Sequence, residues 1–328
     1  MLRLWCGVAL LAVTTCGLTA QQAPPQSQQS AGAVTVHPQN FATEIRKTVG
    51  FLQVDYRDGE TLKQISGTCF FVIYEDARLG KDRGFSYLVT NRHMAVPGVE
   101  KGLSYPVQQV SLFLNFKSPP DGGRHPHWGL GNVLPWAFPE DESVDLAVLP
   151  LAPSHEIFDY RSIPISFIAT KDRIESEGLS PGDSVVFAGY FYQWPGDKKI
   201  QPIVRQGVLA MMPDEEIKTT MQKLGHIYLA DAHAFHGNSG SPLFVSTGGI
   251  RGNSIGVASY LLLGVISGYY PEGESFSVPA ATVLTGEVHD NSGIATVVPG
   301  YELKALLDSP RLQAQRDAAV AAEQKTKP

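Results

Sequence analysis

Short apolar runs separated by turn residues fill most of this 328-residue chain, and this pattern restricts its fold more than any other feature. Glycine (32) and proline (23) are frequent, and both residues favour the turns that join short strands. The runs form two series, the first at residues 48–54, 65–74, 86–90, 110–116 and 144–149, the second at 183–190, 203–211, 227–230, 242–245, 255–267 and 294–298. Because no long helical periodicity interrupts either series, the sequence predicts an all-β protein built from two barrels or sandwiches.

The N-terminal residues do not follow this pattern. Residues 1–20 are typical of an export signal, because Arg3 precedes an apolar stretch and Leu18-Thr19-Ala20 forms an imperfect match to a cleavage site ahead of Gln21. Lipid attachment at Cys16 is the alternative. Residues 21–40 are rich in Gln, Pro and Ser, which predicts a flexible linker. Since the apolar stretch is too short to span a bilayer, we expect a periplasmic or secreted protein with no membrane span.

The composition argues against several functional classes. The net charge is −6 and there is no basic block, so electrostatics does not favour a nucleic-acid partner. If residues 1–20 are removed, Cys69 is the only remaining cysteine and no intramolecular disulfide can form. Cys69 opens an apolar run, where we expect a small buried side chain rather than a nucleophile. The sequence indicates no cofactor, and it does not indicate the oligomeric state.

Three polar residues lie in settings that suit nucleophilic catalysis. His93 ends an apolar strand, Asp145 enters another, and Ser239 lies in a glycine-rich turn before a third. A serine hydroxyl is a weak nucleophile, so it needs an imidazole to accept its proton and a carboxylate to orient that imidazole. Glycines beside the serine allow backbone N–H groups to approach a developing oxyanion. The sequence therefore predicts acyl transfer by a His93, Asp145 and Ser239 triad.

Each of these residues alone also has an ordinary structural explanation. His93 would be a satisfied core histidine, Asp145 a turn or cap residue, and Ser239 a small residue in a turn. Their order along the chain distinguishes the catalytic interpretation, because α/β-hydrolases run serine, acid, histidine and subtilisins run aspartate, histidine, serine.

The segments around these residues resemble the trypsin/chymotrypsin superfamily, and more closely its bacterial branch that includes the HtrA proteases. The matching segments are Val89-Thr90-Asn91-Arg92-His93, Asp145-Leu146-Ala147-Val148-Leu149 and Gly237-Asn238-Ser239-Gly240-Ser241-Pro242. The resemblance implies an all-β fold of two six-stranded antiparallel barrels, with a polypeptide as substrate. It also implies that His93 and Asp145 come from the first barrel and Ser239 from the second.

The resemblance implies further site residues. The N–H groups of Gly237 and Ser239 would form an oxyanion hole, and Ser267 would support the aspartate and begin the substrate-binding strand. His236, Ser267, Gly268 and Tyr269 would bind substrate, and His233 would lie near the base of the specificity pocket. These residues are those at the positions of the family motif in this sequence.

Two positions depart from the family pattern. Asn238 replaces the aspartate that pairs with a newly cut N-terminus in zymogen-type relatives, so we expect no activation switch of that kind. Tyr269 and Tyr270 stand where many relatives keep a small residue. Their side chains either narrow the specificity pocket or fold outward, and the sequence leaves both alternatives open.

The expected organisation follows from these observations. After the signal peptide (1–20) and the linker (21–40), a trypsin-like peptidase domain covers residues 41–308. Its two barrels would cover about residues 41–155 and 156–300, and a helix would follow at 301–308, where leucines fall on one face. Residues 309–328 would form an exposed, weakly helical tail, with no PDZ-like extension.

Two other features have competing interpretations. Residues 117–142 are longer than a hairpin requires and form either a surface insertion or a loop that borders the cleft. The histidine pairs His125 with His127 and His233 with His236 suggest a metal site, but no cysteine or carboxylate cluster lies at ligand spacing. We therefore expect no metal, and we place His125 and His127 in an exposed loop.

The predicted function is that of a serine endopeptidase acting through an acyl-enzyme. One alternative keeps the fold without turnover, as a binding or scaffold protein. Another is an esterase that uses the same site.

Overall fold

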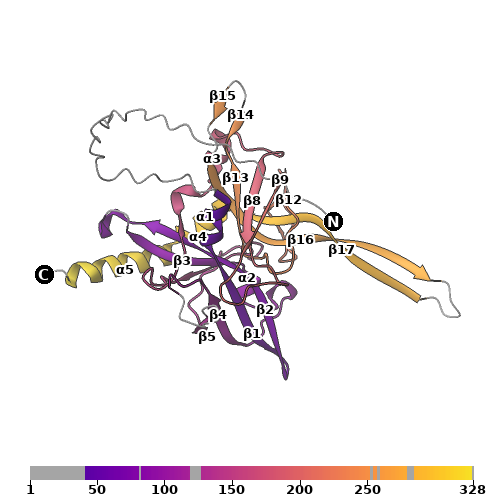
Figure 1. Ribbon diagram of the computed structural model, residues 1–328, viewed down its shortest axis with the longest axis horizontal. Coiled ribbons are helices and arrows are strands. Elements are labelled where there is room, and N and C mark those ends of the chain that lie inside the picture. Colours follow the sequence, from indigo (N-terminus) through magenta and orange to yellow (C-terminus); the bar gives the residue numbers. More distant parts are fainter. Residues whose placement is uncertain are drawn as a thin grey trace, which may run out of the picture. The chain divides into compact units, whose positions relative to one another are not determined.

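The computed structural model describes residues 41–80, 83–118, 127–251, 254–256, 259–278 and 284–326 (Figure 1). The predicted signal peptide, the linker, Cys16 and His125 lie outside these residues. None of the helices in the described part of the chain is long and apolar enough to cross a membrane.

The first half of the described chain forms a seven-stranded sheet. Its strands are β1 (Val49–Asp58), β2 (Thr61–Glu75), β3 (Gly84–Thr90), β4 (Val107–Phe113), β5 (His127–Gly131), β6 (Ala147–Pro150) and β7 (Ser162–Pro164). They pair in the order β5-β4-β1-β2-β3-β6, and β7 runs parallel to β2. Because this order does not return to its first strand within the described residues, the closure predicted for the first barrel is not confirmed.

The second half forms the closed six-stranded barrel that the sequence predicts. Its strands are β8 (Ser184–Gly189), β9 (Ile203–Met211), β12 (Tyr228–Asp231), β13 (Pro242–Ser246), β16 (Tyr260–Val278) and β17 (Leu284–Pro299). They pair in the order β12-β17-β16-β13-β8-β9. The barrel core contains the fully buried side chains of Phe187, Leu209, Leu243, Leu263 and Val297, so the barrel is filled rather than open.

The hairpin of β16 and β17 is longer than the sequence predicts. Its pairing begins at Gly264 opposite Pro299 and continues to Val278 opposite Leu284, so the two strands extend beyond the barrel in Figure 1. Two shorter hairpins are formed by β10 (Ile217–Lys218) with β11 (Leu224–Gly225) and by β14 (Gly249–Arg251) with β15 (Ser254–Gly256).

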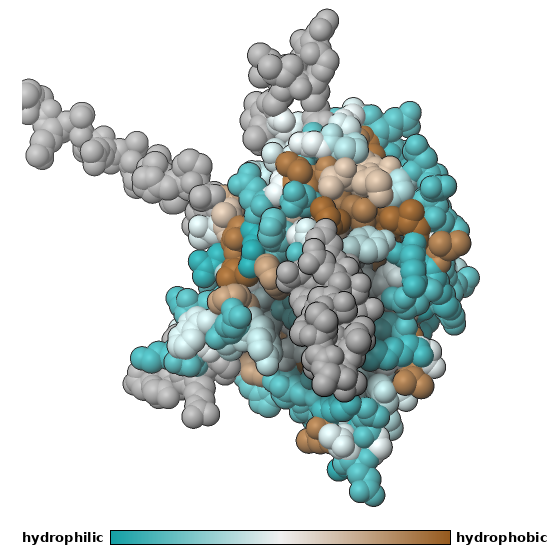
Figure 2. All heavy atoms as spheres, turned by 90° about the vertical axis from the view of Figure 1, so that its right-hand side faces the viewer, coloured by the Kyte–Doolittle hydropathy of each residue, from teal (hydrophilic) through white to brown (hydrophobic). Residues whose placement is uncertain are grey.

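One apolar cluster contains residues of both halves. It includes Phe70 and Val89 of the first sheet together with Phe244 and Val265 of the barrel. Apolar burial of this kind holds packed layers together. On the face shown in Figure 2, hydrophilic residues cover most of the described surface and apolar residues gather over one part of it.

The helices include one that the sequence predicts and others that it does not. The predicted helix is α4 (Gly300–Leu307); the others are α1 (Phe41–Thr48), α2 (Arg92–Ala95), α3 (Lys171–Ser176) and α5 (Pro310–Thr326). The expectation of an exposed C-terminal tail holds for most of α5, but not for Leu312, Arg316 and Val320, which are buried.

Arg316 attaches α5 to the first sheet. Its guanidinium lies 3.8 Å from the ring centroid of Tyr74 on β2. Its Nη1 donates to the hydroxyl of Tyr87 on β3 at 3.2 Å and to the carbonyl of Leu307 at 2.8 Å. A buried guanidinium needs such partners, so α5 is an integral part of the domain.

Residues 117–142 fit neither proposed interpretation completely. They include β5, which pairs with β4, and Ala137, which forms an isolated antiparallel β-bridge with Val148. Trp136 is 9% exposed and belongs to the core of the first sheet. The described part of this segment therefore extends the sheet.

Leu312→Ala tests the role of α5. Leu312 is 1% exposed and packs in the shared apolar cluster, so the truncation should lower the free energy of unfolding by about 2–5 kcal/mol. Denaturant-induced unfolding measures this loss. The exposed Gln315→Ala on the same helix should change stability by less than about 0.5 kcal/mol, and an equal response from both variants would contradict the packing of α5.

Candidate active site

His93 lies in the short helix α2, directly after strand β3. The preceding Asn91 is fully buried, and its Nδ2 donates to the carbonyl oxygen of Asp145 at 2.8 Å. Thr90 at the end of β3 donates its hydroxyl to the carbonyl of Thr68 on β2 at 2.9 Å. These contacts fix the point at which β3 ends, and they bring the histidine to the side of the aspartate segment.

Asp145 binds both the backbone and the ring of His93. Its Oδ1 accepts from the His93 backbone N–H at 3.0 Å, and its Oδ2 lies 2.7 Å from His93 Nδ1. The carboxylate is 1% exposed, whereas the imidazole side chain is 22% exposed. Since Nδ1 donates to the carboxylate, Nε2 is left as the proton-accepting nitrogen of the neutral ring.

The environment of His93 acts on its pKa in opposing directions. Burial lowers the pKa of the imidazole, whereas the charge of Asp145 and its hydrogen bond raise it, with a smaller contribution from Glu100. The net effect is a pKa raised above the ordinary value for histidine. The ring therefore takes up a proton more readily than a free imidazole does.

A second hydroxyl contacts Asp145 and was not predicted from the sequence. Thr220, in the loop that joins β10 and β11, donates its Oγ1 to Asp145 Oδ2 at 3.1 Å. The prediction that Ser267 supports the aspartate is wrong, because the Ser267 hydroxyl lies 3.1 Å from Thr296 Oγ1. No local pattern marks Thr220, since the contact joins residues 75 positions apart.

Ser239 lies in a turn whose backbone requires glycine at two positions. Gly237 has φ +92° and Gly240 has φ +85°, which side chains strongly disfavour. A Cβ at Gly237 would lie 2.5 Å from the ring of Tyr190, and one at Gly240 would lie 2.0 Å from the carbonyl of Thr68. The turn is therefore held close to both halves of the structure.

Asn238 fixes the turn from within. It is 1% exposed, its Nδ2 donates to the carbonyl of Tyr190 at 2.8 Å, and its Oδ1 accepts from the Phe235 backbone N–H at 2.8 Å. Both of its polar groups are satisfied, so the amide stabilises the turn without a charged partner.

The turn is hydrogen-bonded to β2 beside the histidine. The Thr68 N–H donates to the carbonyl of Ser239 at 2.8 Å, and the Thr68 hydroxyl donates to the carbonyl of Gly237 at 2.8 Å. A Cβ at Gly67 would lie 3.0 Å from the Met94 side chain and 3.1 Å from the Ser239 carbonyl. Met94, which follows His93, and the Ser239 turn therefore both pack against residues 67–68 of β2.

The Ser239 hydroxyl has a hydrogen-bond partner in the described part of the chain, unlike two N–H groups of the same turn. Ser239 Oγ donates to the carbonyl of Ser267 at 3.3 Å. Within the residues that the structure describes, the N–H groups of Gly237 and Ser239 donate to no acceptor. Two N–H groups of one turn that have no acceptor remain available to donate hydrogen bonds to an oxyanion.

The predicted substrate-binding residues lie around this turn. His236 Nε2 is 3.2 Å from the hydroxyl of Tyr269. Gly268 lies close to Thr220, since a Cβ there would be 2.9 Å from Thr220 Cγ2. The expectation that His233 lies near the base of a pocket is not met, because its side chain is 67% exposed.

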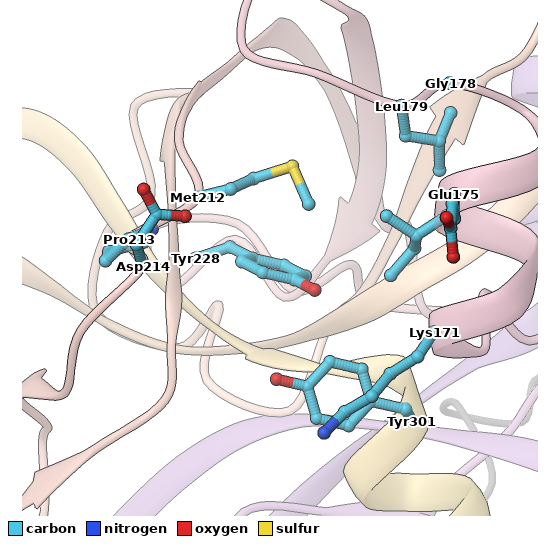
Figure 3. Close-up of a pocket in the computed structure, with 10 residues that line it drawn as sticks. Lys171, Glu175, Gly178, Leu179, Met212, Pro213, Asp214, Tyr228 and Tyr301 are labelled. Carbon is cyan, nitrogen blue, oxygen red and sulfur yellow. The ribbon is translucent and has the colours of Figure 1, made fainter.

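An open cavity of about 490 Å³ occurs elsewhere on the barrel. Figure 3 shows Lys171, Glu175, Met212, Tyr228 and Tyr301 around it. The ammonium of Lys171 lies 4.6 Å from the ring centroid of Tyr301. None of the predicted site residues lines this cavity.

Residues 67–252 match the family of trypsin-like peptidase domains, and this match covers more than half of the chain. The chain belongs to this family. The resemblance drawn from the motifs around residues 93, 145 and 239 is therefore confirmed at the level of the family. Comparison with curated proteins finds no match.

Several solved structures are similar to this trypsin-like peptidase. The HtrA-type protease AlgW with a tripeptide is 15% identical with a TM-score of 0.45, and the match covers 84% of this chain and 63% of that chain. Deg5 is 17% identical with a TM-score of 0.40, covering 69% and 81%. The Rv3671c protease from M. tuberculosis in its active form is 16% identical with a TM-score of 0.42, covering 81% of each chain. This chain thus spans less than two thirds of the AlgW chain.

Asp145→Asn tests the cause of the raised His93 pKa. Without the carboxylate charge, burial becomes the dominant influence, so the pKa of His93 should fall from above its ordinary value to below it. NMR titration of the imidazole protons measures the change. Glu100→Gln removes only the weakest contributor and should lower the pKa far less. A His93 pKa that stays raised in Asp145→Asn would contradict this account.

Proposed function

We propose that this trypsin-like peptidase is a serine endopeptidase that cleaves polypeptides through an acyl-enzyme, with His93, Asp145 and Ser239 as its triad. The observation that carries the proposal is the pair of hydrogen bonds from His93 to Asp145, at 3.0 Å from the backbone and 2.7 Å from Nδ1. They hold the imidazole in the tautomer whose Nε2 can accept a proton.

The proposed reaction begins at the Ser239 hydroxyl. The hydroxyl leaves its contact with the Ser267 carbonyl and transfers its proton to His93 Nε2 as the oxygen attacks the peptide carbonyl. In structures without substrate, catalytic hydrogen bonds are often long or unaligned and form only when substrate binds. Asp145 stabilises the imidazolium that results.

The N–H groups of Gly237 and Ser239 are proposed to bind the oxyanion of the tetrahedral intermediate. One such donor contributes about 10²–10³ in kcat. The intermediate collapses when His93 returns the proton to the leaving amine, which leaves the acyl group on Ser239. Water then attacks the acyl-enzyme by the same steps, and the carboxylic acid product is released.

Export to the periplasm or the medium belongs to the same proposal. It rests on the sequence of residues 1–20, where a basic start, an apolar stretch and small residues follow one another. A polypeptide in that compartment would be the substrate.

Labelling with a fluorophosphonate and peptide digestion test the proposed function. Wild type should be labelled and should cleave an unfolded protein, whereas Ser239→Ala should lose both activities. Asp145→Asn should reduce kcat by about 10⁴, because an amide in place of the carboxylate holds the imidazole in the wrong tautomer. Ser176→Ala, an exposed serine on α3, should behave as wild type.

The same assay separates the alternatives. A folded wild type that is neither labelled nor active would favour a scaffold protein. Labelling with hydrolysis of activated esters but no cleavage of an unfolded protein would favour an esterase. Either outcome would overturn the proposed endopeptidase.

Thr220→Val tests the contact between the β10–β11 loop and Asp145. Removing the donor leaves the carboxylate charge less neutralised, so its attraction for the imidazolium and the pKa of His93 should both rise. Because catalysis requires neutral His93, the acid limb of kcat/KM should move to higher pH, with a severalfold loss at acidic pH. Thr220→Ser restores the donor and should restore the profile; an unmoved acid limb in Thr220→Val would contradict the role of Thr220.

A further inference from the structure

Strand β16 leaves one backbone edge unpaired beside Ser239. Its pairing with β13 ends at Val265 opposite Pro242, whereas its pairing with β17 continues through Gly268 opposite Thr296 and Tyr269 opposite Ala295. In the described part of the chain, no strand therefore pairs with the other edge of residues 267–269. An unpaired edge of this kind can accept an extended polypeptide as an added strand.

The Ser239 turn faces the start of this edge. The Gly240 N–H donates to the Ile266 carbonyl at 2.8 Å, and the Ile266 N–H donates to the Ser241 carbonyl at 2.9 Å. Ser239 Oγ reaches the Ser267 carbonyl at 3.3 Å. A polypeptide that adds to this edge as a strand would therefore run beside the Ser239 turn.

A side-chain contact bridges the same space. His236 belongs to the turn, three residues before Ser239, and Tyr269 belongs to the strand edge, two residues after Ser267. The Tyr269 hydroxyl lies 3.2 Å from His236 Nε2, and the ring centroids are 5.6 Å apart with the planes at 82°. A hydrogen bond at this distance leaves no room for a third side chain between its partners.

From this bridge we infer that Tyr269, held by His236, restricts the residue whose carbonyl is attacked to a small side chain such as that of Gly, Ala or Ser. The inference rests on the proposed function and deepens it by naming a substrate class. It also resolves the alternatives for Tyr269: the ring narrows the site, whereas Tyr270 turns elsewhere and donates its hydroxyl to the Lys218 carbonyl at 2.8 Å. A larger substrate side chain has to break the bridge before its carbonyl can reach Ser239.

Peptide cleavage with matched variants tests the inference. The substrates are peptides that differ only in the residue before the cut, with Ala, Leu or Phe. Wild type should cleave the Ala peptide at least about 10-fold faster, in kcat/KM, than the Leu or Phe peptide, because small volume differences in a site are worth about 10–200-fold. Tyr269→Gly should raise kcat/KM for the Leu and Phe peptides relative to the Ala peptide by a similar factor.

Two further variants separate the bridge from a general structural effect. His236→Ala removes the partner of Tyr269 and should relax the preference in the same direction. Tyr270→Phe loses the contact with Lys218 but keeps an aromatic ring next to Tyr269, so any effect on kcat/KM should be equal for the three peptides. Thermal unfolding of each variant identifies one that fails to fold, and His236→Ala then provides the test if Tyr269→Gly does not fold.

The outcomes distinguish this inference from the proposed function. Wild type that is labelled by a fluorophosphonate but cleaves Leu and Phe peptides as well as Ala peptides would overturn the inference alone. The same conclusion follows if folded Tyr269→Gly and His236→Ala change all three rates equally. Absence of labelling in folded wild type would instead overturn the proposed function.

Discussion

Thr68 on β2 is the point at which the candidate site is assembled. Its N–H donates to the Ser239 carbonyl, its hydroxyl donates to the Gly237 carbonyl and accepts from the Tyr190 N–H, and its carbonyl accepts from Thr90. The side chain is fully buried, so each of these bonds would be costly to leave unmade. One residue thus joins the serine turn, the end of β8 and the end of the strand that leads to His93.

Asp145 depends on both halves of the structure in a similar way. Asp145 and His93 both belong to the first half, just before β6 and in α2, whereas Thr220 reaches the carboxylate from the β10–β11 loop of the second half. The same loop makes an ion pair between Lys223 and Glu142 near the aspartate. A buried carboxylate needs several donors, and here they are supplied by segments far apart in the sequence.

The sequence predicts much of this fold because barrel strands carry a local signal. The run at 203–211 coincides with β9, and the order of His93, Asp145 and Ser239 indicates the family. Other features lack such a signal. The buried face of α5 contains Arg316, which packs on the ring of Tyr74 more than two hundred positions away. Because this face is partly charged, the sequence alone predicts an exposed segment. The length of the β16–β17 hairpin is likewise set by pairing, not by apolar content.

The error over Ser267 shows where a family pattern stops being informative. A motif records which residue types recur, but the partner of a hydroxyl is decided by the nearest acceptor in the folded chain. Thr296 lies opposite Gly268 on β17 and takes the Ser267 hydroxyl, while the turn after β10 places Thr220 against Asp145. A threonine in that loop can therefore take over the contact with the acid, and Ser267 is left to contribute its carbonyl to Ser239.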